Sequence, residues 1–100
     1  MADLIVVYWR DIPAQVIARA GRRNQVKVEL SPRFAKAIDV AAMRGGARDA
    51  DDYLADWRRA DPIQISDDLR AEADGMVRRL EAEYDDARLN ELANNGGRNP

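Results

Sequence analysis

Arginine is the residue of this chain best suited to chemistry, because histidine and cysteine are both absent. Their absence excludes imidazole acid–base catalysis, thiol nucleophiles, disulfides and zinc sites built on Cys or His. Of the 16 basic residues, only Lys27 and Lys36 are lysines. A guanidinium binds carboxylates and phosphates through a fixed planar fork. The sequence therefore offers anion recognition, although a compositional bias towards arginine would give the same count.

The first candidate site is Trp9-Arg10-Asp11, which ends the apolar run in VVYWRDI, residues 6–12. Arg10 could bind an anion or a carboxylate beside an aromatic wall, since Trp and Arg are common at binding hot spots. In the alternative interpretation, Trp9 is a core residue and Arg10-Asp11 closes the strand with a local ion pair or a turn. The pattern favours this structural alternative and leaves the binding role open.

The second candidate is a predicted hairpin tip around the turn 21–24. Its cations are Arg19, Arg22, Arg23 and Lys27. A solvated loop explains them, and the alternative is a prong that enters an acidic groove of a protein partner or rests on phosphates. Nucleic acid is the less favoured partner, because four cations make few phosphate contacts and no aromatic residue lies within the turn.

The third candidate is Trp57-Arg58-Arg59, which we expect at the end of a short helix. Cations near a helix C-terminus are favoured by the helix dipole, so a structural role suffices for Arg58 and Arg59. If that helix packs near the end of the first strand, both Trp-Arg steps would border one surface.

The acidic residues do not predict a metal site or an active site. Asp49, Asp51 and Asp52 suit a helix start, and the spacing of an EF-hand loop is absent. There is no GxGxxG sequence, no P-loop and no serine-nucleophile motif, and Ser31 and Ser66 are expected to cap helices. We therefore expect no catalysis, no metal and no cofactor.

The first third of the chain predicts strands. Residues 3–11 are apolar on both faces, and residues 25–30 alternate cleanly. Residues 14–20 could be a short helix after Pro13 or the first strand of a hairpin that turns at 21–24. The β-branched Val16 and Ile17 favour the hairpin.

The sequence from Ser31 onward predicts three helices and one short strand. Ser31-Pro32 begins a helix that Gly45-Gly46 ends, and Asp49 caps a second helix that extends through Trp57. Residues 62–65 form a short strand. Ser66 caps a long last helix whose apolar stripe runs from Leu69 to Ala87 and which could continue past Leu92.

These elements predict an α+β fold: an antiparallel sheet of three to four strands, covered on one face by two short helices and a long C-terminal helix. We expect one domain over residues 1–93 and a disordered tail over 94–100. The apolar run at the start is too short for a signal peptide and has no basic lead, so we expect a cytoplasmic protein without a membrane segment.

Several unusual sequence segments occur in order: YWRDIPAQV, GRR, SPRFAKAIDVAAMRGG and YLADWRR. They resemble a bacterial "virulence factor" domain family, found as short stand-alone proteins and as a module of larger conserved virulence factors. The likeness spans roughly residues 1–60. It implies a single soluble domain and supplies no catalytic residues. It also associates stand-alone members with one-carbon and folate-linked enzymes.

We therefore expect a non-catalytic interaction or accessory module that binds a larger protein through its arginines, with a homodimer as a further possibility. Residues 1–48 carry nine basic and four acidic residues, whereas 49–100 carry seven and fourteen, so two copies could attract each other. The alternative is a small subunit or ligand-binding domain of a one-carbon enzyme that contacts an anionic small molecule through Arg10.

Overall fold

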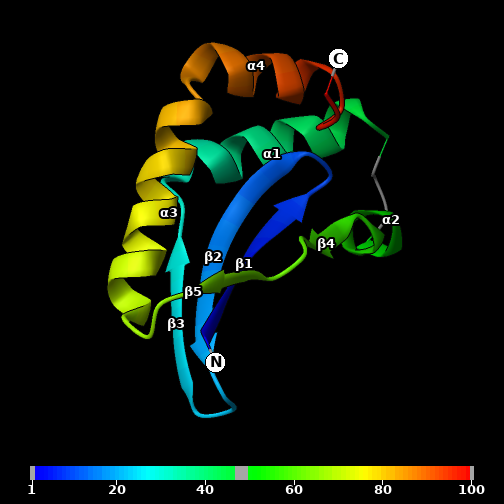
Figure 1. Cartoon of the computed structure of the whole chain (residues 1–100). Helices are drawn as coiled ribbons and strands as arrows, with labels where there is room; N and C mark the ends of the chain where they lie inside the picture. The colour runs from blue at the N-terminus through cyan, green and yellow to red at the C-terminus, as the bar shows by residue number, and fades with distance from the viewer. Residues whose placement is uncertain (1, 47–49, 100) are drawn as a thin grey trace.

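The computed structural model describes residues 2–46 and 50–99, which form an antiparallel sheet with helices packed against it (Figure 1). In that part of the chain the sheet has five strands, one more than the upper expectation, and the α+β class is confirmed. The elements are β1 (Ala2–Trp9), β2 (Ile12–Ala20), β3 (Asn24–Glu29), α1 (Pro32–Arg44), α2 (Ala50–Ala55), β4 (Trp57–Arg59), β5 (Ile63–Ile65), α3 (Leu69–Glu83) and α4 (Asp86–Asn94).

Strand β1 is central because it pairs along both of its edges. One edge pairs with β2 over its whole length, and β2 then pairs with β3. The other edge pairs with β4 opposite residues 7–9 and with β5 opposite residues 2–4. The side chains on both faces of β1 are also buried, Leu4 and Val6 on one face and Ile5 and Val7 on the other, which fits its nearly continuous apolar run.

Residues 14–20 belong to a strand, as the β-branched residues favoured, and not to a helix. Strict alternation would place Trp9 on the face opposite Leu4 and Val6. Instead, the register shifts between Val7 and Tyr8, and Trp9 joins the same buried cluster as Leu4 and Val6. Pro13 lies at this irregularity and is buried, where its missing N–H breaks a ladder that is already irregular.

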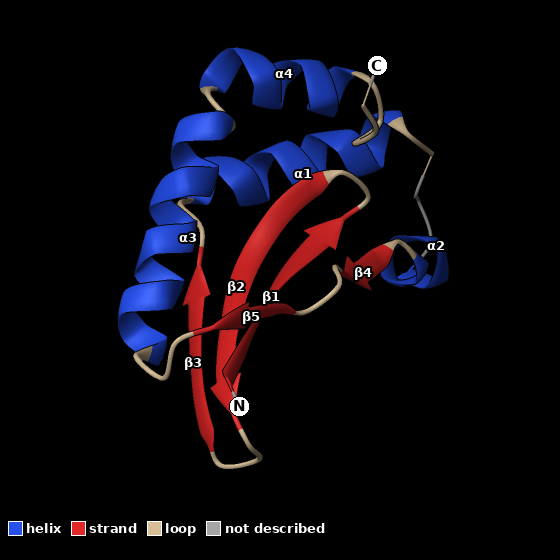
Figure 2. Ribbon diagram, in the orientation of Figure 1, coloured by secondary structure: helices blue, strands red, loops and turns tan. Residues whose placement is uncertain are grey.

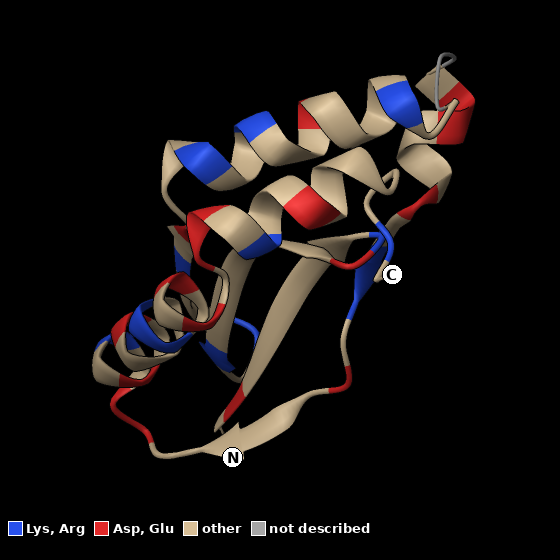
Figure 3. Cartoon of the chain, turned by 90° about the horizontal axis from the view of Figure 1, so that it is seen from above, with Lys and Arg blue, Asp and Glu red and all other residues tan. Residues whose placement is uncertain are grey.

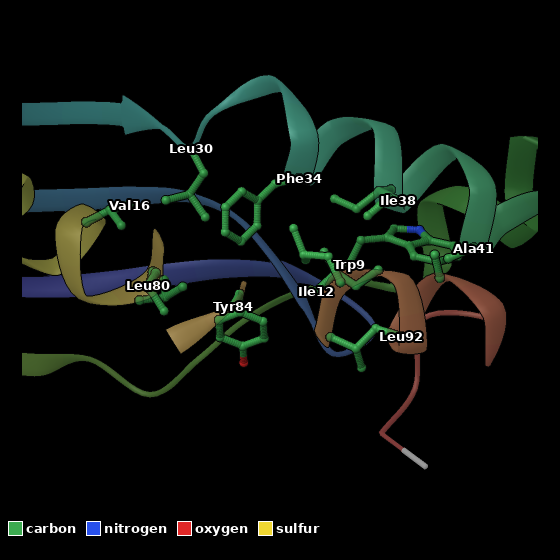
Figure 4. Packing of buried hydrophobic residues seen from close by; sticks show 14 of the residues in the cluster. Trp9, Ile12, Val16, Leu30, Phe34, Ile38, Ala41, Leu80, Tyr84 and Leu92 are labelled. Carbon is green, nitrogen blue, oxygen red and sulfur yellow. The ribbon is translucent and has the colours of Figure 1, made fainter. Parts of the chain in front are cut away.

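The helices pack together with the sheet around one hydrophobic core. Helix α3 packs on β2 and β3, and α1 packs on β2 and on α4 (Figure 2). Figure 4 shows Ile38 and Leu92 from these helices near Trp9, and Phe34 and Leu80 farther along the same cluster. The end of β1 is therefore held within the core.

The long last helix of the sequence analysis is two helices. It begins at Leu69, where Asp68 and not Ser66 caps it by accepting from the Ala71 N–H at 3.3 Å. It ends after Glu83, and Asp85 begins α4 by accepting from the Arg88 N–H at 2.8 Å. The new cap redirects the chain, so α4 packs on α1 instead of continuing away from the core.

The expected second helix is also shorter. Residues 57–59, expected as the last turn of this helix, form strand β4. They pair with the edge of β1 that β2 leaves free. The expected strand at 62–65 is confirmed as β5. The expected cap Asp49 lies outside the described residues. Ser31 begins α1 as expected, but its hydroxyl makes no cap and bonds to Glu81 instead.

The segment expected to be a disordered tail begins inside α4 and continues as turns over residues 95–98. Gly96 and Gly97 are buried, and Gly97 accepts a hydrogen bond from the Asp11 N–H at 2.8 Å. Gly97 has φ +87°, and a Cβ there would lie 2.9 Å from the Trp9 ring. Glycine allows this segment to approach the core without an apolar side chain of its own.

Candidate functional site

The two-residue turn between β1 and β2 consists of Arg10 and Asp11, and its backbone is tied to two distant segments. The Arg10 N–H donates to the Asp56 carbonyl at 3.1 Å, and the Asp11 N–H donates to the Gly97 carbonyl at 2.8 Å. Arg10 has φ +54°, a left-handed conformation that normally favours glycine. An arginine is retained in this strained position by what its side chain contacts.

The Arg10 guanidinium is fully engaged within the chain. Its Nε and Nη2 atoms each lie 3.0 Å from Oδ2 of Asp56, and its Nη1 donates to the Gly96 carbonyl at 2.6 Å. The guanidinium carbon lies 4.6 Å from the centroid of the Trp9 ring. Only 11% of the side chain is exposed, and a Cβ at Gly45 would overlap Nη1. Arg10 is thus a structural clamp whose three guanidinium nitrogens each contact an acceptor within the chain.

Arg58 completes the arrangement from β4. Its Nε donates to the Arg10 carbonyl at 2.9 Å, its Nη2 lies 3.3 Å from Oδ1 of Asp11, and its guanidinium carbon lies 4.6 Å from the centroid of the Tyr8 ring. Asp11 also accepts from the Asn99 N–H at 2.7 Å. We name this group of side chains the turn cluster: Arg10, Asp11, Asp56 and Arg58.

Trp9 supports the turn cluster from inside the core. Its ring is 0% exposed, and its Nε1 donates to the Tyr53 carbonyl at 2.8 Å. The Tyr53 ring stacks on it with centroids 5.6 Å apart. A side chain with no exposed surface has no area to offer a partner, so Trp9 positions α2 rather than a ligand.

The turn between β2 and β3 begins at Gly21, whose φ of +70° suits a tight turn. Arg19, just before it, pairs with Asp3 through an Nε–Oδ1 distance of 2.8 Å. Beyond this pair, Arg22, Arg23 and Lys27 are exposed, and within the described residues none of the three takes part in an ion pair. We name this group the hairpin tip: Arg19, Arg22, Arg23 and Lys27.

Shallow hollows lie on two sides of the hairpin tip, and their charges differ. One is lined by Arg19 and Arg22, together with polar and glycine residues. The other contains Arg23 beside Asp67 and Asp68 from the segment before α3. The first hollow suits a carboxylate at Arg22, since Arg19 is already paired with Asp3, whereas the second holds two acidic residues of its own beside Arg23.

The structure separates the expected site residues into two groups at opposite ends of β2 (Figure 1). Arg10 and Arg58 meet at the β1–β2 turn, so the two Trp-Arg steps lie side by side, as expected if the segment around Trp57 packs near the end of the first strand. Arg59 pairs in register with Val7 and is exposed. The hairpin tip lies at the other end, so the expected site residues do not share a single surface.

A further polar network escaped the sequence analysis. Glu81 accepts from both the N–H and the hydroxyl of Ser31 at 2.8 Å each, and Arg33 Nη2 lies 2.9 Å from its Oε1. Burial alone would raise the pKa of Glu81, but these hydrogen bonds and the Arg33 charge outweigh burial and lower it. Glu81 is about 50 residues from both Ser31 and Arg33 in the sequence, so no local sequence pattern predicts these contacts.

Acidic and basic residues are distributed along the described elements without a metal-binding cluster. Over residues 2–46 and 50–99, no three acidic side chains converge in a way that could hold a metal ion. Figure 3 shows basic and acidic residues interspersed along the helices, so the charge asymmetry of the sequence is mixed in the fold. None of the helices in the described part of the chain has the length and apolar character that a membrane span requires.

The comparisons with known proteins give one result. A family model described as "Virulence factor" matches residues 7–93, which extends the likeness from residue 60 through α3 and α4. No match was found among curated proteins or among solved structures. Membership of this family does not in itself indicate catalysis. Because the match spans both turns of the sheet and the helices that cover it, the chain belongs to the virulence factor domain family.

Proposed function

We propose that this chain is a non-catalytic protein-binding module that engages an acidic segment of a larger partner through its hairpin tip. The observation that carries the proposal is the state of its guanidinium groups. Those of the turn cluster are bonded within the chain, whereas Arg22 and Arg23 are exposed and have no ion pair among the described residues.

The hairpin tip suits this role for two physical reasons. An exposed guanidinium keeps its donors available, and Arg22, which borders one hollow, can receive carboxylates together with the adjacent exposed Arg23. Exposed charges also steer encounter and set specificity more than they add affinity, which fits an accessory module. The alternative small-molecule site at Arg10 has no support from the geometry, since Asp56 and Gly96 occupy that guanidinium.

The test uses a matched pair of charge reversals. The tagged protein captures partners from native lysate, the partner is identified by mass spectrometry and purified, and its Kd is measured for three forms of the chain. Arg22→Glu with Arg23→Glu changes the hairpin tip. Arg78→Glu with Arg79→Glu makes the same charge change at two adjacent exposed arginines of α3.

We expect the hairpin-tip variant to weaken binding at least about tenfold, and more at low salt than at high salt. We expect the α3 variant to stay within about threefold of the unmodified chain. Equal losses of affinity in the two variants would show that binding responds only to the net charge of the chain, and would overturn the proposal. So would unchanged affinity in both.

A further inference from the structure

A cavity of about 480 Å³ lies apart from both groups of arginines, between α1, α2 and the sheet. Its floor is apolar and includes Val7, Leu30 and Ile38, all of which are buried. This volume falls within the usual range of small-molecule sites, which are mostly apolar with a few polar groups that orient the ligand.

Two aromatic side chains line one wall and are held in place from behind. The Tyr53 ring stacks on Trp9, and the Trp57 ring meets Tyr53 edge-on with centroids 5.9 Å apart. The Tyr53 carbonyl receives the Trp9 Nε1 hydrogen bond, and Trp57 is fixed by its pairing with β1. The wall is therefore preorganised, which reduces the entropy that a ligand would lose on binding.

The charge of the lining is negative. Glu29, at the end of β3, and Asp39, on α1, both line the cavity and are exposed. Among the described lining residues none is basic, and the two carboxylates make no ion pair there. Burial, and then the charge of Asp39, raise the pKa of Tyr53, so the field of that carboxylate reaches the aromatic wall.

From this combination we propose that the cavity binds a small organic cation, a protonated amine carried on a short apolar body. The apolar floor would receive the body, and Tyr53 and Trp57 present aromatic surface that attracts a cation. Glu29 and Asp39 would supply the opposite charge. An anion would meet two carboxylates, and a neutral molecule of the same shape would gain only from burial.

The probes for the test are 2-phenylethylamine, the neutral 2-phenylethanol and the anion 3-phenylpropionate. Binding is followed by NMR at the indole N–H of Trp57 and the ring signals of Tyr53, in the full chain at neutral pH. We expect the amine to bind about tenfold more tightly than the alcohol, because attraction to aromatics and to exposed carboxylates adds modestly to burial. The anion should bind most weakly.

The control variants separate cavity charge from overall charge. Glu29→Gln with Asp39→Asn should reduce the preference for the amine from about tenfold to about threefold, the share that the aromatic wall supplies, and leave the alcohol unchanged. Asp61→Asn with Glu91→Gln makes the same charge change at exposed residues that do not line the cavity, and should keep the tenfold preference.

Equal binding of amine and alcohol would overturn the proposal, as would a tenfold preference that the first variant leaves unchanged. No saturable shift at Trp57 up to about 20 mM amine would overturn it as well, because a fitting fragment of this size binds in the millimolar range. The hairpin-tip reversal Arg22→Glu with Arg23→Glu should leave this titration unchanged, so this inference and the proposed function can fail separately.

Discussion

The two turns that flank β2 contain similar residues and have opposite surroundings. At the β1–β2 turn, Arg10 reaches Asp56 and Gly96, and Arg58 crosses back to Asp11. At the β2–β3 turn, Arg22 and Arg23 extend into solvent. What distinguishes them is therefore the number of chain segments that meet at each end of the sheet.

This difference teaches how a guanidinium is assigned its role in a small domain. The β1–β2 turn is contacted by the end of α2 through Asp56 and by the C-terminal turn through Gly96, and both contacts supply acceptors. Among the described residues, the hairpin tip meets Asp3 through Arg19 and lies near the acidic segment before α3 at Arg23, and no ion pair forms at Arg22 or Arg23. Arginines that meet acceptors within the chain stabilise the fold, and those that do not remain available for binding.

The largest expected effect is at Trp9. Trp9→Ala should lower the free energy of unfolding by about 3–5 kcal/mol, because it removes a fully buried aromatic ring and leaves a cavity. Chemical denaturation monitored by far-UV circular dichroism measures the loss. If the alanine variant does not fold, Trp9→Phe should still fold with a smaller loss. A stability unchanged by Trp9→Phe and Trp9→Ala would contradict the placement of Trp9 in the core.

The next effect sharpens the contrast between the two turns directly. Arg10→Met keeps the aliphatic stem and removes the guanidinium, so Asp56 and the Gly96 carbonyl lose their donors. We expect a loss of about 2 kcal/mol in the free energy of unfolding. Arg59→Met, at an exposed arginine of β4, is the matched control and should change little. Equal losses would break the comparison.

A smaller effect is expected at Glu81, whose charge is also bonded within the chain, to Ser31 and Arg33. Because its pKa is lowered in the fold, Glu81 contributes stability above the ordinary glutamate pKa of about 4.3, and this is lost as pH falls through the lower folded value. Glu81→Gln should cost about 1 kcal/mol near neutral pH.

Denaturation of both forms as a function of pH measures this contribution. The difference between the unmodified chain and Glu81→Gln should narrow as the pH falls below about 4. A difference that stays constant over that range would show that the carboxylate charge is not what stabilises the contact with Ser31 and Arg33.

The smallest effect on stability is expected at the hairpin tip. Arg22→Ala with Arg23→Ala should leave the melting temperature within about 2 °C, because neither side chain makes an ion pair among the described residues. Differential scanning calorimetry measures it. A loss as large as that of Arg10→Met would mean that these arginines also support the fold, and the contrast between the turns would disappear.

Local patterns predicted much of the fold. The alternation of Val26 and Val28 located β3, and Ser31-Pro32 located the start of α1. Errors arose where a distant partner decided the outcome. Residues 57–59 became a strand because β1 had a free edge, and α3 ended because Asp85 could cap a helix that packs on α1. Neither partner is visible in the neighbouring residues.

The candidate sites show the same limit. Arg10 was singled out from its position after an apolar strand, and a local ion pair or turn was the favoured interpretation. The turn is present, but the ion pair joins Asp56, 46 residues away. Gly96 and Gly97 have no side chain from which a sequence pattern could predict a contact. Their backbone carbonyls nevertheless accept hydrogen bonds from Arg10 and Asp11 of the same turn. The cavity beside Tyr53 likewise combines residues from six separate elements, together with Leu30 between β3 and α1.

We propose that guanidiniums bonded within the chain serve the fold and that the exposed Arg22 and Arg23 of the hairpin tip serve binding. Solvent exchange of each arginine Nε–H, measured by NMR in the free chain and with its purified partner, tests it most directly. We predict slow exchange at Arg10 in both states, and fast exchange at Arg22 and Arg23 that slows when the partner binds. Fast exchange at Arg10 in the free chain, or no change at Arg22 and Arg23 with the partner, would contradict the claim.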